Sequence, residues 1–248
     1  YTFQQSISSS LGYHQPYPNA ASAFLYSLFR IGTNPFIFIL MMLVLPNIMS
    51  YDLLNMHQNH AVYPIETRLT RQRFYQEVYI KNMISSFLVV LCLQLGLLIV
   101  SHMMLAPIHF QSMTYPEGYY ITTQLLCPNE CLNLIFFLLL TSLGYALISG
   151  LLFSLQSNIT NKYVYRCCGV IIGILLVLFP ALIQGYLPYP DSAFIIQINN
   201  LVALGLEHVR ENPFGLSHWS LYILCFLIYA GICYLCFQVL LKRRESHD

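Results

Sequence analysis

The side chains that could do chemistry are mostly imidazoles and thiols, and their spacing offers little to a metal ion. His57 and His60 stand three residues apart in HQNH, and Cys127 and Cys131 frame CPNEC. Structural zinc sites need four such ligands. We therefore predict no metal site, a solvated surface for the two histidines, and either a disulfide or two free thiols in CPNEC.

Catalytic motifs are absent from the sequence. There is no G-x-x-x-x-G-K-[ST], no H-E-x-x-H and no G-x-S-x-G, so a P-loop, a zincin site and a nucleophile elbow are excluded. Cys233 and Cys236 have the spacing of a redox pair but lie in an apolar run, where they are expected to be small hydrophobes. We predict a chain that is not an enzyme and has no cofactor of its own.

The composition predicts the fold that positions these residues. Charged residues make up 8% of the 248-residue chain, hydrophobic residues make up 57%, and the mean hydropathy is +0.60. Soluble domains are about 25% charged, and an apolar run of about 20 residues can cross a bilayer as a helix. The predicted fold is therefore an all-α polytopic membrane protein.

Five transmembrane helices are visible in the hydropathy pattern, within a single transmembrane domain (1–248). An outer loop (1–30) precedes them, a polar cytoplasmic elbow (52–82) separates the first from the second, and a long outer loop (188–220) precedes the last. Within that loop, residues 192–209 look amphipathic and could lie flat or dip back toward the membrane. Thr70 is a suitable N-cap, so a helix is expected to begin near Arg71 and continue into the second span. The five predicted spans are 31–51, 83–106, 132–157, 167–187 and 221–241.

Small residues recur at helical spacing in two spans and predict close helix packing. They are Ser142, Ala146, Gly150 and Ser154 in the third span, and Gly169 and Gly173 in the fourth. The span interiors contain no Asp, Glu, Lys or Arg. Ionisable groups at membrane depth usually serve function, so proton-coupled transport is disfavoured. The polar exceptions are expected to join helices; they are Gln94, His102, Asn133 and Gln184.

The basic residues predict the orientation. Five alternating spans put nine of the eleven Lys and Arg residues on one side, leaving Arg30 and Arg210 on the other. The positive-inside rule makes the first side cytoplasmic. The C-terminus is then cytoplasmic, in the plasma (inner) membrane, and Tyr1 is outside. One further helix before Tyr1 would give six, with both ends in the cytoplasm.

The elbow lies between two long apolar runs, and it holds Arg68, Arg71, Arg73 and Lys81. Two interpretations compete. It is either an ordinary solvated connection whose arginines anchor helix ends, or a docking element for a partner protein. The first interpretation explains poorly why about thirty residues stand where a tight turn of a few residues would suffice.

The elbow and its flanks resemble the membrane subunits of bacterial ABC exporters, namely the permeases of the second exporter class. The resemblance covers residues 34–106, in the order NPF, an apolar run, LPNIMSYD, and IETRLTRQRFYQEVYIKN running into an apolar helix. Many such permeases carry a TR-x-[ST]-R-x-x-Y element after the second helix and a basic residue opening the third, which Lys81 matches. The element's counterparts here, within one residue of the spacing, are Thr67, Arg68, Thr70, Arg71 and Tyr75.

The resemblance implies a permease subunit that exports a peptide-like or amphipathic substrate. The implied partners are two copies of an ABC ATPase, which would bind ATP and Mg²⁺, a second permease chain, identical or different, and the bilayer; nucleic acid is not expected. A cytoplasmic coupling helix would lie within Asp52–Arg68, and the visible spans would be helices two to six. The residues expected to couple to the ATPase are Glu66, Arg68, Arg71 and Arg73.

A second hypothesis from a different class stays open. The chain could be a non-transporting membrane immunity, sensor or assembly protein whose elbow binds a partner. A neighbouring gene for a P-loop ATPase would favour the transporter.

Overall fold

The structure is a computed structural model, and it describes six helical elements of the chain. The described residues are 41–42, 44, 70–104, 108, 126–127, 129–156, 159, 161–186, 190–202, 204 and 215–245. The predicted outer loop (1–30) and the elbow up to residue 69 lie outside them. So does the predicted first span (31–51), apart from three helical residues, Met41, Met42 and Val44.

Helix α6 (Arg71–Met104) is 34 residues long and has no interruption. It starts where the sequence predicted: Thr70 precedes it, and the Thr70 carbonyl accepts the Phe74 N–H at 3.1 Å. At 1.5 Å per residue the helix is about 51 Å long, whereas a bilayer core is about 30 Å thick. The polar first turns and the apolar remainder therefore form one continuous helix that is longer than a membrane core is thick.

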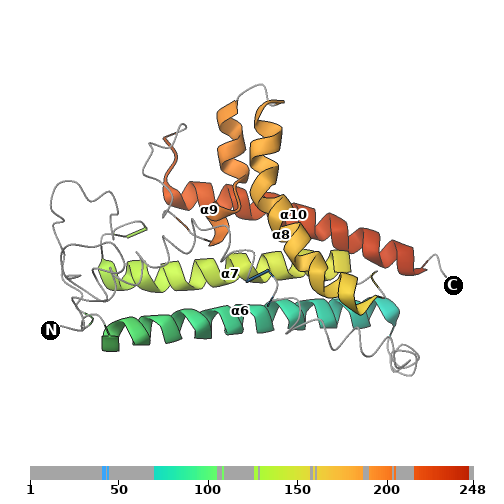
Figure 1. Ribbon diagram of the computed structural model, residues 1–248, viewed down its shortest axis with the longest axis horizontal. Helices are drawn as coiled ribbons and strands as arrows, with labels where there is room; N and C mark the ends of the chain where they lie inside the picture. The colour runs from blue at the N-terminus through green and yellow to red at the C-terminus, as the bar shows by residue number, and fades with distance from the viewer. Residues whose placement is uncertain are drawn as a thin grey trace.

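Helix α7 (Glu130–Gln156) is the centre of the fold and lies between α6 and α10 (His218–Glu245). Gln94 of α6 pairs with Thr141 of α7, whereas Asn82 pairs with Ser149, so the two helices are antiparallel. Figure 1 shows α6 and α7 side by side along their lengths. Most of the buried hydrophobic core belongs to α7 and to the faces packed on it.

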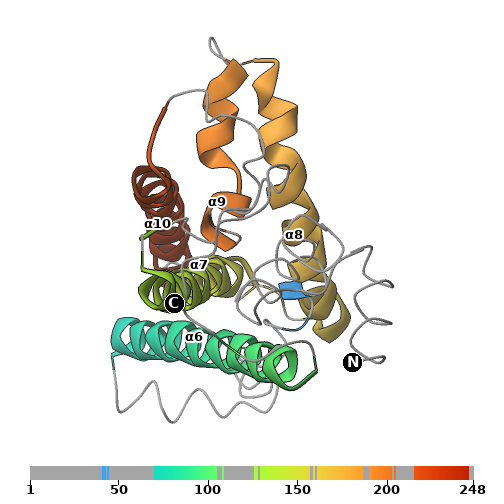
Figure 2. The ribbon, with the colours of Figure 1, turned by 90° about the vertical axis from the view of Figure 1, so that its left-hand side faces the viewer.

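Helix α8 (Lys162–Gln184) begins earlier than predicted. The sequence was interpreted as a basic turn over 158–166, followed by a span at 167–187. Instead, Asn161 caps a helix that already includes Lys162, because its side-chain oxygen accepts the N–H groups of Tyr163 and Val164 at 2.9 and 3.4 Å. A capping side chain of this kind satisfies backbone donors that the helix itself leaves unpaired. In Figures 1 and 2, α8 leans away from the α6–α7 pair.

The stretch predicted as an outer loop (188–220) contains further structure. A 3₁₀-helix, η1 (Pro190–Ile196), runs beside α8, and a single helical turn, α9 (Asn199–Val202), packs on α7 and α10. Five apolar side chains of this stretch are buried; they are Ala193, Ile198, Leu201, Val202 and Leu204. The sequence predicted that residues 192–209 would lie flat or dip back toward the membrane, and the described part of this segment packs into the helix bundle.

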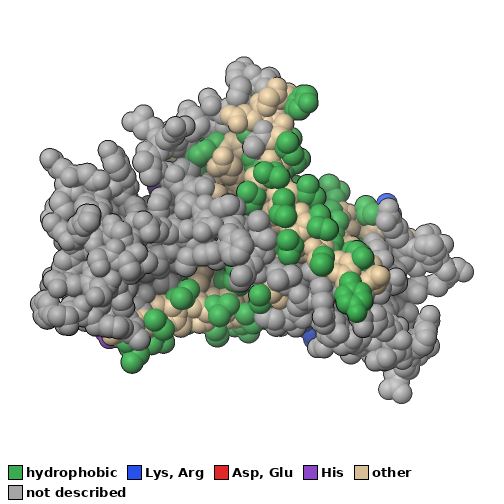
Figure 3. All heavy atoms as spheres, viewed as in Figure 1, with side chains coloured by type: hydrophobic (Ala, Val, Ile, Leu, Met, Phe, Trp, Pro, Cys, Tyr) green, Lys and Arg blue, Asp and Glu red, His purple; other side chains and the backbone are tan. Residues whose placement is uncertain are grey.

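Within the described part of the chain, four helices are long and apolar enough to cross a membrane. They cover Gln72–Val100, Cys131–Gln156, Tyr163–Gln184 and His218–Lys242. The described surface over α8 and α6 in Figure 3 is largely hydrophobic, as expected of helices that face lipid. The prediction of an all-helical membrane protein is confirmed to this extent.

Candidate functional site: the basic end of helix α6

The first three turns of α6 expose a polar surface. Gln72, Gln76 and Lys81 are exposed there. Arg73 and Glu77 are also exposed, at 72% and 47% of their side-chain surface, and the Arg73 Nε lies 3.6 Å from a Glu77 carboxylate oxygen. An exposed pair four residues apart on a helix contributes only about 0.3–0.5 kcal/mol. The charges on this surface are thus available to a partner with little loss of folding energy.

The opposite face of the same turns is aromatic and buried. Phe74 and Tyr75 pack edge to face, with ring centroids 5.4 Å apart, and Tyr75 has no exposed surface. They form one cluster with residues at the ends of α7 and α10: Phe153, Phe237, Leu240 and Leu241. The start of α6 therefore packs against the ends of both α7 and α10.

Tyr79 continues this attachment one turn further along α6. Its ring centroid lies 4.6 Å from that of Phe237 in α10 and 5.9 Å from that of Phe153 in α7. Its hydroxyl reaches Gly150, where a Cβ atom would lie only 2.8 Å from the hydroxyl oxygen. The missing side chain at Gly150 is therefore what lets Tyr79 lie between the two helices.

A line of buried polar side chains follows along the contact between α6 and α7. The Asn82 Nδ2 donates to the Ser149 Oγ at 2.9 Å and to the Ser149 carbonyl at 3.2 Å. The Ser86 hydroxyl donates to the same Ser149 Oγ at 2.6 Å. Two residues of α6 thus meet on one serine of α7.

The same line has a second group of bonds about two turns further along. The Gln94 Nε2 donates to the Thr141 Oγ1 at 2.8 Å, and the Ser142 hydroxyl donates to the Gln94 Oε1 at 3.4 Å. Bonds of this kind between membrane helices average about 0.6 kcal/mol. Their joint effect is to fix the register of α6 on α7, since a shift of one helix past the other would break both groups of bonds.

The residues predicted to mediate helix packing are all buried. In α7, Gly150 and Ser142 face α6 through Tyr79 and Gln94, and the Ser154 hydroxyl bonds to the Gly150 carbonyl at 3.0 Å. Ala146 is 2% exposed. Gly169 and Gly173 are buried in α8.

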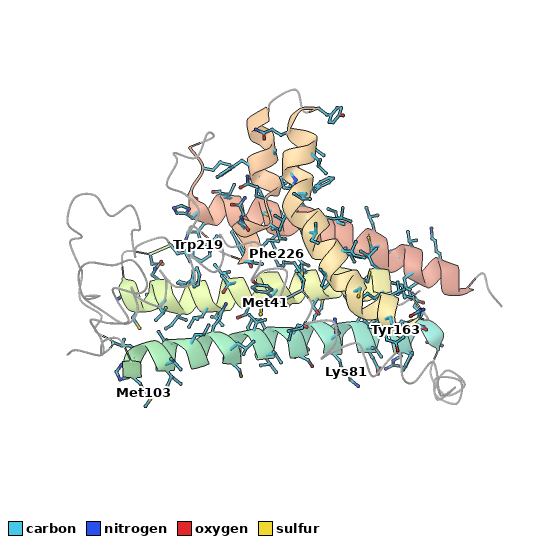
Figure 4. The ribbon with its side chains drawn as sticks, in the orientation of Figure 1. Met41, Lys81, Met103, Tyr163, Trp219 and Phe226 are labelled. Carbon is cyan, nitrogen blue, oxygen red and sulfur yellow. The ribbon has the colours of Figure 1, made fainter. Side chains whose placement is uncertain are left out.

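Three helix ends that carry basic residues point toward the same end of the long axis in Figure 1: the start of α6, the start of α8 and the end of α10. Figure 4 places Lys81 and Tyr163 near this end, and Met103 and Trp219 toward the other. In Figure 3 the visible Lys and Arg atoms lie in the right-hand half of the view.

The four residues expected to couple to an ATPase are only partly described. Glu66 and Arg68 lie outside the described residues, as do His57 and His60. Arg71 is the first residue of α6, and Arg73 stands on its exposed face. The stretch proposed as the coupling helix (52–68) also lies outside the described residues.

The polar residues expected to join helices have different roles. Gln94 joins α6 to α7. The His102 Nδ1 accepts the Ile108 N–H, and the Asn133 Oδ1 accepts the Leu126 N–H, so these two hold connecting segments instead. Gln184 is exposed at the end of α8.

The sequence analysis did not predict that the start of α6 packs against α7 and α10. It also did not predict that Ser149 accepts hydrogen bonds from Asn82 and Ser86. The signal was present: Asn82, Ser86 and Gln94 are separated by four and eight residues, which places them on one helix face. Phe74 and Tyr79 stand among charged residues in the sequence, so their packing was not predicted.

The described residues join the exposed start of α6 to the ends of α7 and α10. Among the described residues, no three His, Cys, Asp or Glu side chains gather as metal ligands. Cys127 and Cys131 are free thiols in the structure. No protein-family model, curated protein or solved structure matches the chain.

Proposed function

We propose that this chain is a membrane-spanning permease subunit of an ATP-driven ABC transporter. It exports a peptide-like or amphipathic substrate from the cell and is driven by a separate pair of ATPase subunits in the cytoplasm, which bind ATP and Mg²⁺. A second permease chain, identical or different, completes the pathway.

One observation carries this proposal. The exposed basic start of α6 and the apolar part of α6 are one uninterrupted helix, so a displacement applied at Arg73 is transmitted along the whole helix. The cluster around Tyr75 transmits the same displacement to the ends of α7 and α10. A subunit that must convert movement of a soluble partner into movement of its membrane helices needs such a connection.

The polar line between α6 and α7 supports the same function. Because Asn82 and Gln94 hold α6 in register on α7, the two helices move as one body. Rigid-body movement of packed helices is how alternating access is achieved in many transporters.

The test is purification of the tagged full-length chain from its native membrane in mild detergent, followed by identification of the proteins that accompany it. A P-loop ATPase in stoichiometric amount is the expected result. Recovery of the chain alone, or with other partners only, would contradict the proposal and favour a membrane immunity, sensor or assembly protein. The matched control is the same purification with Arg71 and Arg73 both changed to glutamate, which should lose the ATPase.

A further inference from the structure

The segment between α8 and α10 turns back into the core of the bundle. The Leu201 carbonyl oxygen lies only 2.5 Å from where a Cβ atom on Gly144 would be. Gly144 is near the middle of α7, a helix of membrane-spanning length. Backbone outside the four long helices therefore reaches about half the depth of α7.

The bundle provides partners for this backbone. The Tyr229 hydroxyl donates to the Ile196 carbonyl at 2.9 Å, and the Cys225 thiol donates to the Gln197 carbonyl at 3.5 Å. Non-helical backbone at membrane depth is tolerated only where it is buried in protein or lines an aqueous cavity. Gly144, Cys225 and Tyr229 thus form a seat that accepts peptide backbone.

The segment has less regular secondary structure than the long helices. A thiol is a weak hydrogen-bond donor, and α9 is a single turn of four residues. The chain enters the segment after Gln184, at the end of α8, and leaves it before His218, at the start of α10. Both connections lie on one side in the predicted topology, so the segment could withdraw without carrying a helix through the membrane.

We propose that residues 190–204 are a displaceable plug, and that the seat they vacate is the outer part of the path for an apolar, peptide-like substrate. The seat already binds peptide carbonyls through Tyr229 and Cys225, and apolar residues of the core cluster pack around the segment. A peptide backbone with apolar side chains would find the donors and the space that the plug uses. This substrate assignment rests on the proposed transport function, whereas displacement of the plug does not.

Native cysteines provide the test, because they differ in what covers them. Cys225 is 0% exposed and bonds to the plug. Cys233, on the same helix, is 2% exposed and bonds to the Leu147 carbonyl of α7 at 3.4 Å. The experiment uses the purified chain in lipid nanodiscs, in two forms. One form retains Cys225 as its single cysteine, and the other retains Cys233 as its single cysteine. The reagent is a membrane-impermeant maleimide.

If the plug withdraws, Cys225 should be labelled about tenfold faster than Cys233, because a weakly held segment opens far more often than the packed core. The change Tyr229→Phe should raise the Cys225 rate about threefold through loss of one interhelical bond. Tyr222→Phe is the matched control, since the Tyr222 hydroxyl bonds to the Leu140 carbonyl of α7 at 2.8 Å and not to the plug.

Equal labelling of the two cysteines, with no effect of Tyr229→Phe, would overturn the plug. The substrate class has its own arm, in which a synthetic peptide AFIIQINNLVAL, the sequence of residues 193–204, is added during labelling. Loss of most Cys225 labelling with this peptide, but not with a scrambled one, supports the peptide site, and unchanged labelling overturns it. No ATPase is present, so these results are independent of the purification that tests the transporter.

Discussion

The carbonyl oxygen of Leu201 occupies the space that a side chain on Gly144 would need. The contact joins a short re-entering turn to the middle of a long apolar helix. A larger residue at Gly144 must displace backbone, and backbone yields less easily than the tip of a side chain.

Replacing Gly144 with leucine is therefore expected to destabilise the protein by about 1–3 kcal/mol, the usual cost of overpacking a core. Gly96→Leu is the matched control, because Gly96 lies in α6 with open space around its Cβ position. Thermal unfolding in detergent should show a lower midpoint for the first variant and little change for the second. Equal midpoints would show that Leu201 does not pack against Gly144.

Gly150 makes the second prediction, through its contact with Tyr79. A methyl group on Gly150 would lie 2.8 Å from the Tyr79 hydroxyl oxygen and 3.1 Å from the ring carbon that bears it. Gly150→Ala should destabilise the chain, and Tyr79→Phe should recover part of that loss by removing the nearer atom. A double-mutant cycle on thermal stability measures this coupling, expected at about 0.5 kcal/mol or more for residues in contact. Additive effects would contradict the contact.

The polar bonds between α6 and α7 give a third prediction. Changing Gln94 to leucine leaves the Thr141 hydroxyl without its donor, and the stability should fall by about 0.6 kcal/mol. Changing Thr141 to valine as well removes both partners, so the double variant should lose less than the sum of the two single variants. Thermal unfolding of the three variants tests this prediction. A double variant whose loss of stability equals the sum of the two single losses would show that the bond contributes nothing.

The long helices could be predicted from the sequence because apolar runs of membrane length have few alternatives. The start of α6 at Arg71 could also be predicted, because Thr70 separates a polar stretch from a continuous helical pattern. The re-entering segment could be predicted only as two alternatives, lying flat or dipping back toward the membrane. Its amphipathic pattern fits both, and its burial depends on Gly144 and Tyr229, which are distant in sequence.

Only the charged surface of the site at the start of α6 could be predicted from the sequence, for a related reason. Its charges, such as Arg73, stand out in a chain with so few of them. The burial of Tyr75 could not be predicted in the same way, because an aromatic side chain among charges is equally consistent with a membrane interface. Tertiary contacts with Phe153 and Phe237 decide between the two.

Charge reversal at Arg71 and Arg73 tests the coupling role. Glutamate at position 73 would face Glu77 four residues away, which costs only a few tenths of a kcal/mol on an exposed helix face. The double variant should therefore insert and unfold like the parent while ATPase binding, or stimulation by the permease, is lost. Lys242→Glu is the control, since Lys242 is exposed near the end of α10 at the same end of the structure. Coupling that survives in the double variant, or that is lost equally in the control, would show that the start of α6 is not the docking surface.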